Sequence, residues 1–251
     1  MPGPIVLVGS GEFTAAMEAV DRDLLAATGR ARPRVAIVPT ASWPDGEATF
    51  QGWIEQGRAH FSALGAEVEG VELRTRQDAF DEAFAQAIGE ADLVYLSGGK
   101  PDHLLDVLEL TPAGAALWSL HLRGGIVAGC SAGAMALAAR QPRLRGRRPI
   151  RVPLGWRDAL GLVEGAAVLP HYDALPEPLA ALVALASSRG TTVLGIDEET
   201  AAIVRDGTWL VRGRGRVTVW RGRGRRRHRD GETFRLDGFD EERRPTDVGR
   251  R

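Results

Sequence analysis

Two adjacent side chains that could act as nucleophiles stand in residues 126–137, which read IVAGCSAGAMAL. An apolar run ends at a glycine, Cys130 and Ser131 follow, and a stretch rich in alanine comes next. Residues 129–133 fit the pattern G-x-S-x-G, in which a serine occupies a strained turn between a strand and a helix. Small neighbours are needed because larger side chains would collide across so tight a turn. Ser131 is the centre of the pattern, and we expect Cys130 to be a small buried core residue.

A serine nucleophile needs a base within hydrogen-bonding reach, and that base needs an acid that orients it. The chain has five histidines. We favour His171, because it follows the apolar run AAVLP at the C-terminal end of an expected strand and therefore lies on the same sheet edge as Ser131. His103, in the segment SGGKPDHLL, is the second candidate, since it follows another loop at a strand end.

Residues 197–199 offer the orienting acid, because the run VLGIDEE ends a further expected strand with Asp197, Glu198 and Glu199. Three carboxylates in a row leave open which of them is used. A glycine pair at 98–99, just after LVYLS, can bring a backbone N–H close to the serine. The N–H groups of Gly99 and Ala132 would then form a two-donor oxyanion hole, in which each donor contributes ~3–4 kcal/mol.

The elements that must position these residues follow from the hydrophobic pattern. Short apolar runs such as PIVLVG at 4–9 and RVAIVPT at 34–40 alternate with longer segments of helical spacing. The segment TPAGAALWSLHLRGG begins with Thr111 as an N-cap, has a proline at the first helical position and closes on glycine. This alternation predicts an α/β fold, flavodoxin-like, with a mostly parallel sheet and helices on both of its faces.

The pattern changes in the second half of the chain. From about residue 141 the composition is basic and rich in proline, which predicts an exposed loop, and after residue 200 short β segments are separated by turn signals. We therefore predict one α/β domain over 1–238, with extra antiparallel strands in a C-terminal hairpin region at 200–238. Residues 239–251 are predicted to be a charged, flexible tail.

Composition narrows the class of protein. The 251 residues carry a formal net charge of −1, and a single cysteine excludes both a disulfide framework and a multi-cysteine zinc site. No apolar run reaches membrane length, so we expect a cytoplasmic protein that does not bind a membrane. The arginine-rich segment 212–229 could bind nucleic acid, but the near-neutral chain favours a flexible, solvated hairpin, and we expect no nucleic-acid partner.

Six segments, in order along the chain, resemble the cyanophycinase and dipeptidase E group of serine peptidases, which have the class I glutamine-amidotransferase-like fold. They are VGSGEF, AIVPTAS, LSGGKPDHLL, GCSAGA, LPHYD and GIDEETA. The resemblance implies Ser131 as the nucleophile, His171 as the base and Glu198 as the acid, with Asp197 as the alternative. It implies no metal and no organic cofactor, and it allows a homodimer.

The same resemblance implies a function. It points to hydrolysis of a small aspartyl or isoaspartyl peptide through an acyl-enzyme on the serine. Lys100 or an arginine of the 143–151 loop, such as Arg148, would pair with the substrate carboxylate. Cyanophycin, β-aspartyl dipeptides and α-aspartyl dipeptides remain open as substrates. The rival hypothesis is a catalytically inactive protein of the same fold with a binding or regulatory role.

Overall fold

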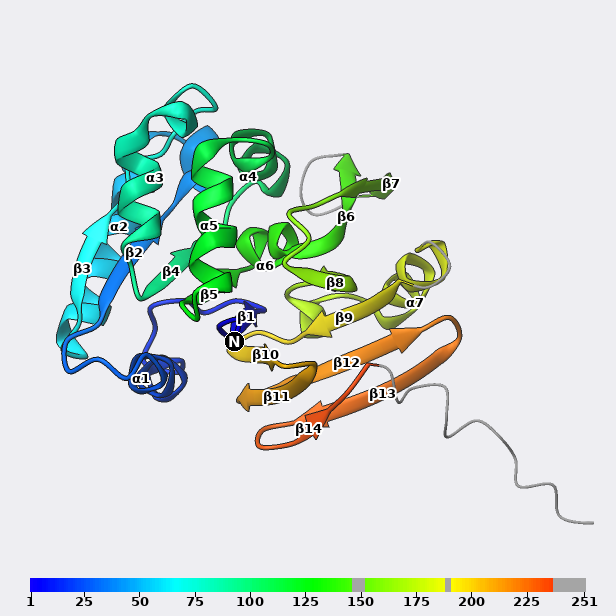
Figure 1. Ribbon diagram of the computed structural model, residues 1–251. Coiled ribbons are helices and arrows are strands. Elements are labelled where there is room, and N and C mark those ends of the chain that lie inside the picture. Colours follow the sequence, from blue (N-terminus) through cyan, green and yellow to red (C-terminus); the bar gives the residue numbers. More distant parts are fainter. Residues whose placement is uncertain (146–151, 188–190, 237–251) are drawn as a thin grey trace, which may run out of the picture.

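The protein consists of two β-sheets with helices packed around them (Figure 1). This computed structural model describes residues 1–145, 152–187 and 191–236. The strands are β1 (Ile5–Val8), β2 (Arg34–Val38), β3 (Glu67–Gly70), β4 (Leu93–Leu96), β5 (Ile126–Cys130), β6 (Ala138–Arg145), β7 (Val152–Asp158), β8 (Val163–Leu169), β9 (Thr192–Ile196), β10 (Thr200–Arg205), β11 (Thr208–Gly213), β12 (Arg216–Arg221), β13 (Gly224–Arg229) and β14 (Thr233–Phe234). The α-helices are α1 (Glu18–Ala27), α2 (Glu47–Ala63), α3 (Glu82–Gly89), α4 (Pro101–Leu108), α5 (Pro112–Leu122), α6 (Ala132–Leu137) and α7 (Glu177–Ala186), and the 3-10 turns are η1 (Thr40–Asp45), η2 (Asp78–Phe80) and η3 (Tyr172–Ala174).

The first sheet has eight strands in the order β14-β11-β10-β1-β5-β4-β2-β3. Neighbours from β1 to β3 run parallel, while β10, β11 and β14 extend the sheet with antiparallel pairing. The central strands are buried along their whole length, which is why they read as continuous apolar runs in the sequence. The carboxyl ends of β4 and β5 consequently lie side by side, and this edge carries both the glycine pair and Ser131.

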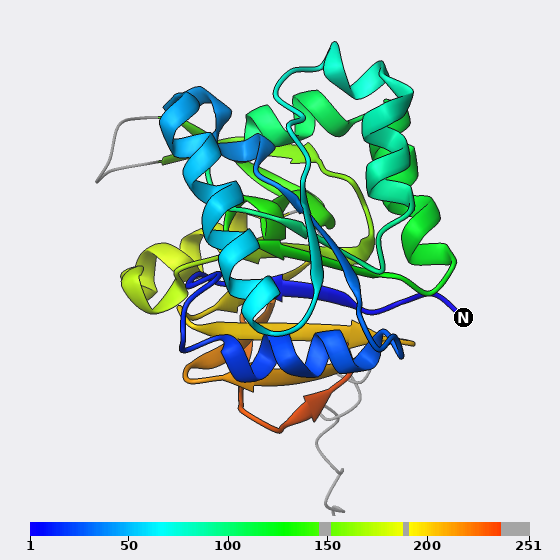
Figure 2. The same ribbon diagram turned by 90° about the vertical axis from the view of Figure 1, so that its left-hand side faces the viewer.

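Helices cover both faces of this sheet. Side chains of α1 and α2 pack on one face, and side chains of α3, α4 and α5 pack on the other. A view along the sheet edge separates α2 from α3 and α5 (Figure 2). Helix α5 begins as its sequence predicts, because the Thr111 hydroxyl accepts the Gly114 N–H and Pro112 occupies the first turn. The predicted α/β class, with helices on both faces and antiparallel strands near the C-terminus, is confirmed.

A second sheet, which the sequence pattern does not separate from the first, has six strands in the order β13-β12-β9-β8-β6-β7. Strands β6, β8 and β9 are parallel neighbours, and the outer pairs are antiparallel. His171 and residues 197–199 therefore follow strands of a different sheet from the one that carries Ser131. The short helix α6 is buried throughout and packs against β5 of the first sheet and β8 of the second, which brings the two strand ends together.

One of the two predictions about the basic segments is wrong. The stretch from residue 141 is not simply an exposed loop, because most of it forms β6 and β7; a register shift between Pro142 and Leu144 accommodates the proline. Residues 212–229 include the predicted hairpin, because β12 and β13 pair antiparallel directly after the end of β11. Arg225 and Arg227 of β13 both form ion pairs with Glu177 of α7, so these positive charges connect the hairpin to helix α7.

Candidate active site

Ser131 occupies a strained turn between β5 and α6. Its backbone has φ 50° and ψ −104°, in the region that side-chain-bearing residues avoid, and its N–H donates to Val8 O at 2.9 Å. The glycines around it are required by space. A Cβ at Gly129 would lie 2.5 Å from the carbonyl carbon of Gly133, and a Cβ at Gly133 would lie 2.3 Å from Leu96 O. The local sequence therefore folds into a turn that presents the serine hydroxyl at the sheet edge.

His171 reaches this hydroxyl from the end of β8. It adopts a left-handed conformation (φ 52°, ψ 40°), and its Nε2 lies 3.0 Å from Ser131 Oγ. Its other ring nitrogen, Nδ1, lies 2.7 Å from Glu198 Oε1. An ionised carboxylate can only accept, so Nδ1 carries the proton and Nε2 is left with a lone pair that faces the serine O–H. In this tautomer the imidazole can act as a base toward Ser131.

The three carboxylates at the end of β9 lie in different surroundings. Glu198 contacts His171, and Glu199 pairs with Arg214 at 2.8 Å. Asp197, whose side chain is only 6% exposed, accepts the Arg216 N–H at 2.9 Å and lies 3.5 Å from Arg216 Nε. Burial raises the pKa of Asp197. The structure thus brings Glu198, and not Asp197, to the imidazole.

The other histidines are engaged elsewhere. His103, the second candidate for the base, lies on α4 with Nε2 at 2.8 Å from Arg74 O. His60 pairs with the buried carboxylate of Asp21 at 2.8 Å. His228 stacks on the ring of Phe234 in the C-terminal strands. His121, on α5, lies beside the ring of Trp118. Of the five histidines, all of them described, only His171 reaches the Ser131 hydroxyl.

Cys130 is fully buried next to the serine. Its Sγ donates to Glu12 Oε2 at 2.8 Å. Burial, followed by the neighbouring Glu12 carboxylate, raises the pKa of this thiol well above its ordinary value. A thiol that stays protonated and has no exposed surface is a poor nucleophile, which leaves the chemistry of this turn to the hydroxyl.

The glycine pair lies against the serine. A Cβ built on Gly98 would be 3.5 Å from Ser131 Cβ and 4.0 Å from Ser131 Oγ. Gly99 has φ 145°, and a Cβ on it would meet Ala41 O at 2.2 Å, so the loop passes between the η1 backbone and the nucleophile turn. The Gly98 N–H is already used, because it donates to Glu12 Oε1 at 3.0 Å. Glu12 was not predicted as a site residue; the one sequence signal for it is its place in the segment VGSGEF.

Of the two residues predicted to bind a substrate carboxylate, the structure describes one, Lys100. Lys100, which follows the glycine pair, forms an ion pair through Nζ with Asp45 Oδ1 at 2.6 Å, and both side chains are partly exposed. Its backbone N–H donates to Ala41 O, which fixes the start of α4. Arg148 lies outside the described residues, as does the predicted tail at 239–251.

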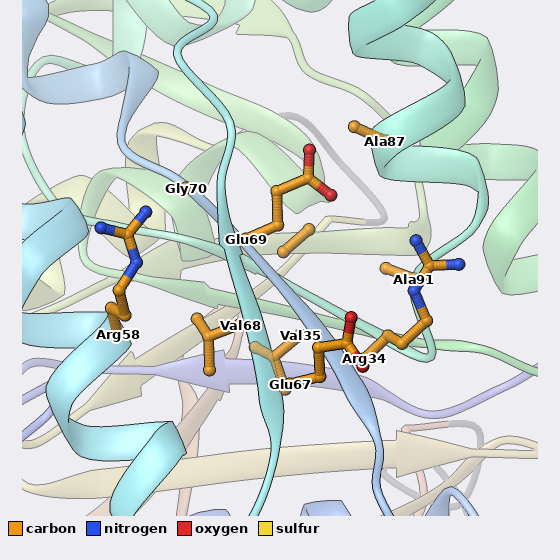
Figure 3. A pocket seen from close by; sticks show the side chains of 10 residues that line it. Arg34, Val35, Arg58, Glu67, Val68, Glu69, Gly70, Ala87 and Ala91 are labelled. Carbon is orange, nitrogen blue, oxygen red and sulfur yellow. The ribbon is translucent and has the colours of Figure 1, made fainter.

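The His171 side chain is 36% and the Glu198 side chain 47% exposed, while Ser131 is partly buried. A pocket of about 310 Å³ lies elsewhere, at the β2–β3 edge, where Arg34 and Arg58 stand on opposite sides of Glu69 (Figure 3). A second pocket, of about 410 Å³, is lined by Trp156 and its charged neighbours. Neither pocket includes a residue of the serine site.

The described part of the chain contains neither a candidate metal-binding cluster nor a candidate membrane-spanning helix. Among its residues, no three His, Cys, Asp or Glu side chains gather closely enough to hold a metal ion. None of its helices combines the length and the apolar character that a membrane crossing requires.

The site has the arrangement of a serine hydrolase: a serine lies at a strand-to-helix turn of an α/β fold, an imidazole is hydrogen-bonded to the serine, and a carboxylate is hydrogen-bonded to the imidazole. Comparison with known proteins specifies the class further. The model of peptidase family S51 matches residues 5–211. The chain belongs to this family and is a serine-type peptidase, which acts on a peptide substrate.

Individual relatives agree with this family. A cyanophycinase of Trichormus variabilis is 28% identical over 223 residues, which are 86% of this chain and 72% of that protein. An uncharacterized peptidase of Pasteurella multocida is 30% identical over 184 residues, or 71% of this chain and 84% of the relative. The crystal structure of a peptidase from an acI-B1 actinobacterium superposes with a TM-score of 0.81 at 29% identity, covering 94% of this chain and 98% of the other.

Proposed function

We propose that this protein is a serine peptidase of the cyanophycinase and dipeptidase E type that hydrolyses small aspartyl or isoaspartyl peptides through a Ser131–His171–Glu198 triad. The observation that carries the proposal is the unbroken row of contacts, 3.0 Å from Ser131 Oγ to His171 Nε2 and 2.7 Å from His171 Nδ1 to Glu198 Oε1. Both distances are within hydrogen-bonding range, and the order of groups is the one that activates a serine.

In the proposed reaction, Ser131 Oγ attacks the carbonyl carbon of the scissile amide while His171 Nε2 takes the hydroxyl proton. Glu198 accepts the Nδ1–H throughout and stabilises the imidazolium that forms. The N–H groups of Gly99 and Ala132 stabilise the tetrahedral oxyanion. The imidazolium then gives its proton to the leaving amine as the C–N bond breaks. Water next attacks the acyl-enzyme while His171 Nε2 takes its proton, the bond from Ser131 Oγ to the acyl carbon breaks, and the imidazolium returns the proton to Ser131 Oγ.

The aspartyl preference rests on the likeness to the cyanophycinase relatives and on the charge next to the oxyanion loop. Lys100 follows Gly99 directly, and its side chain is 41% exposed. In this proposal the Lys100 ammonium pairs with both Asp45 and the carboxylate of the substrate, and Arg148 is a second cation that pairs with the substrate carboxylate.

We further propose that the protein works in the cytoplasm, that residues 1–238 form one domain, and that two copies associate as a homodimer.

The first test is labelling with a fluorophosphonate probe, which reacts with activated serines. Wild type and Cys130→Ala are expected to be labelled, and Ser131→Ala is expected to remain unlabelled. Hydrolysis of β-aspartyl dipeptides, α-aspartyl dipeptides and cyanophycin then separates the three substrate classes. If the folded wild-type protein neither takes the label nor cleaves any of these peptides, the proposal is wrong and a binding or regulatory role takes its place.

A further inference from the structure

The carboxylate of Glu12 connects the two segments that carry the proposed catalytic groups. Glu12 lies in the loop after β1, and the residue is only 7% exposed. One oxygen, Oε1, accepts the Gly98 N–H at 3.0 Å, and the other, Oε2, accepts the Cys130 S–H at 2.8 Å. Each of these partners is the immediate neighbour of a proposed catalytic group, because Gly98 precedes Gly99 and Cys130 precedes Ser131.

We propose that Glu12 is a positioning residue that sets the distance between the oxyanion-hole loop and the nucleophile turn. This inference rests on the proposed function, since it assigns Glu12 a role in the same reaction. Glu12 does not contact the reacting atoms itself. It acts through Gly98 and Cys130, and its removal would let Gly99 N–H and Ser131 Oγ move relative to each other.

The strand pairing explains why such a connection is needed. The ladder between β4 and β5 ends with Leu96 opposite Gly129. Beyond that point the two chains diverge, one into the glycine pair and the other into the serine turn. A buried carboxylate with two acceptor oxygens spans this gap, where it replaces the cross-strand hydrogen bonds that the sheet no longer supplies.

Glu12 is itself held firmly. The next residue, Phe13, has φ 62° and lies in an aromatic cluster, with its ring centroid 4.9 Å from that of Tyr95 and 5.9 Å from that of Phe61. Space on the other side is equally restricted, since a Cβ on Gly98 would lie 3.0 Å from Glu12 Oε1. The raised pKa of Cys130 keeps its sulfur protonated, so it remains a donor to the carboxylate. The carboxylate therefore has little freedom to move.

The test compares Glu12→Ala, Glu12→Gln and the wild type by steady-state kinetics on the peptide that the wild type cleaves. Glu12→Ala removes both acceptors, and a displacement of the oxyanion loop by about 1 Å lowers kcat about 100-fold. Glu12→Gln keeps an acceptor for Gly98 N–H and loses the one for the thiol, so kcat is expected to fall about 10-fold, as a partial rescue. KM is expected to change less than about 3-fold in both, because the proposed substrate contacts are untouched.

A matched control separates positioning from general stability. Asp21 is also a buried carboxylate, but its side-chain hydrogen bond goes to His60, and it affects Cys130 only through the field of its charge. Asp21→Asn is expected to lower Tm while leaving kcat unchanged. A peptide aldehyde, which forms a tetrahedral adduct with the serine, adds a second readout: its Ki should rise in parallel with the loss of kcat/KM in the Glu12 variants only.

The outcomes distinguish the two proposals. If wild type and Asp21→Asn hydrolyse the peptide while folded Glu12→Ala shows the expected loss of kcat, the positioning role stands. A folded Glu12→Ala protein with unchanged kcat and unchanged aldehyde Ki refutes it and leaves the proposed function intact. If Glu12→Ala does not fold, the same decision is made on Glu12→Gln. A wild type that neither takes the fluorophosphonate label nor cleaves peptide overturns the proposed function, and the role of Glu12 with it.

Discussion

The two neighbouring acids Asp197 and Glu198 allow a sharp test of the proposed triad, because the same isosteric change can be made at each. Glu198→Gln replaces the carboxylate that lies 2.7 Å from His171 Nδ1. Asp197→Asn replaces a carboxylate one residue earlier that is bound to Arg216. The two variants alter charge and shape equally, so any difference in their effect on kcat reports which side chain orients the imidazole.

The expected magnitude for Glu198→Gln follows from the geometry. A neutral amide either turns an N–H toward Nδ1, which favours the wrong tautomer, or offers an oxygen that no longer stabilises an imidazolium. A comparable change in a buried serine-peptidase triad costs about 10⁴-fold in kcat. Here the two side chains are 36% and 47% exposed, so water can replace part of the interaction. We therefore expect about a 10³-fold loss, equivalent to about 4 kcal/mol in activation free energy.

Asp197→Asn is expected to act on stability instead. The asparagine oxygen can still accept the Arg216 N–H, but the contact with the Arg216 guanidinium, 3.5 Å away, loses its charge. Because burial disfavours the ionised carboxylate, removing its charge offsets part of the lost contact, and we expect the free energy of unfolding to fall by no more than about 1 kcal/mol. kcat should remain within about 3-fold of the wild type, since Asp197 is not in contact with His171.

The assay is kcat on the cleaved peptide together with urea unfolding of each variant. The reasoning is refuted if folded Asp197→Asn loses as much kcat as Glu198→Gln, because the acid would then be shared or misassigned. It is equally refuted if Glu198→Gln keeps more than about a tenth of wild-type kcat, since the 2.7 Å contact would then have no catalytic weight.

Two further predictions concern side chains beside the serine. Because it is buried and its pKa is raised, the Cys130 thiol should not react with DTNB at pH 8 until the protein is unfolded in urea. Reaction in the native state would contradict this. The folded state also holds the thiol proton more tightly than the unfolded state does, so the free energy of unfolding should fall as the pH rises above about 8.5. Lys100→Gln breaks an exposed ion pair, so the free energy of unfolding should change by less than about 1 kcal/mol. The same change should raise KM for aspartyl peptides about 10-fold and leave KM for neutral peptides unchanged.

The positions of the nucleophile turn and the strands around it could be predicted from local sequence. Residues 129–133 combine an apolar strand, glycines where any Cβ would collide, and a serine at the centre. Thr111 likewise marks the start of α5 with a cap and a following proline. Such signals work because the conformations depend on residues within one turn of each other, so neighbouring side chains are sufficient to select them.

The arrangement of the second half of the chain depended on long-range contacts. Periodicity shows that a segment is a strand, but it does not say which sheet the strand joins, and β8 and β9 form a sheet apart from β5. The basic stretch after residue 141 has a composition typical of loops, yet pairing with β8 and tolerance of proline at a bulge make it a strand. Tertiary packing overrode the local preference in this region.

By itself, then, the sequence determined the α/β class, the serine turn, and the set of histidines and acids from which a base and an orienting acid could come. Only the tertiary structure decided that Glu198 and not Asp197 contacts His171, and that Glu12 joins Gly98 to Cys130. The physical reason is the same for both. Consecutive side chains point in different directions, set by the backbone, and a contact between residues 86 or 118 positions apart in the chain leaves no local trace in the sequence.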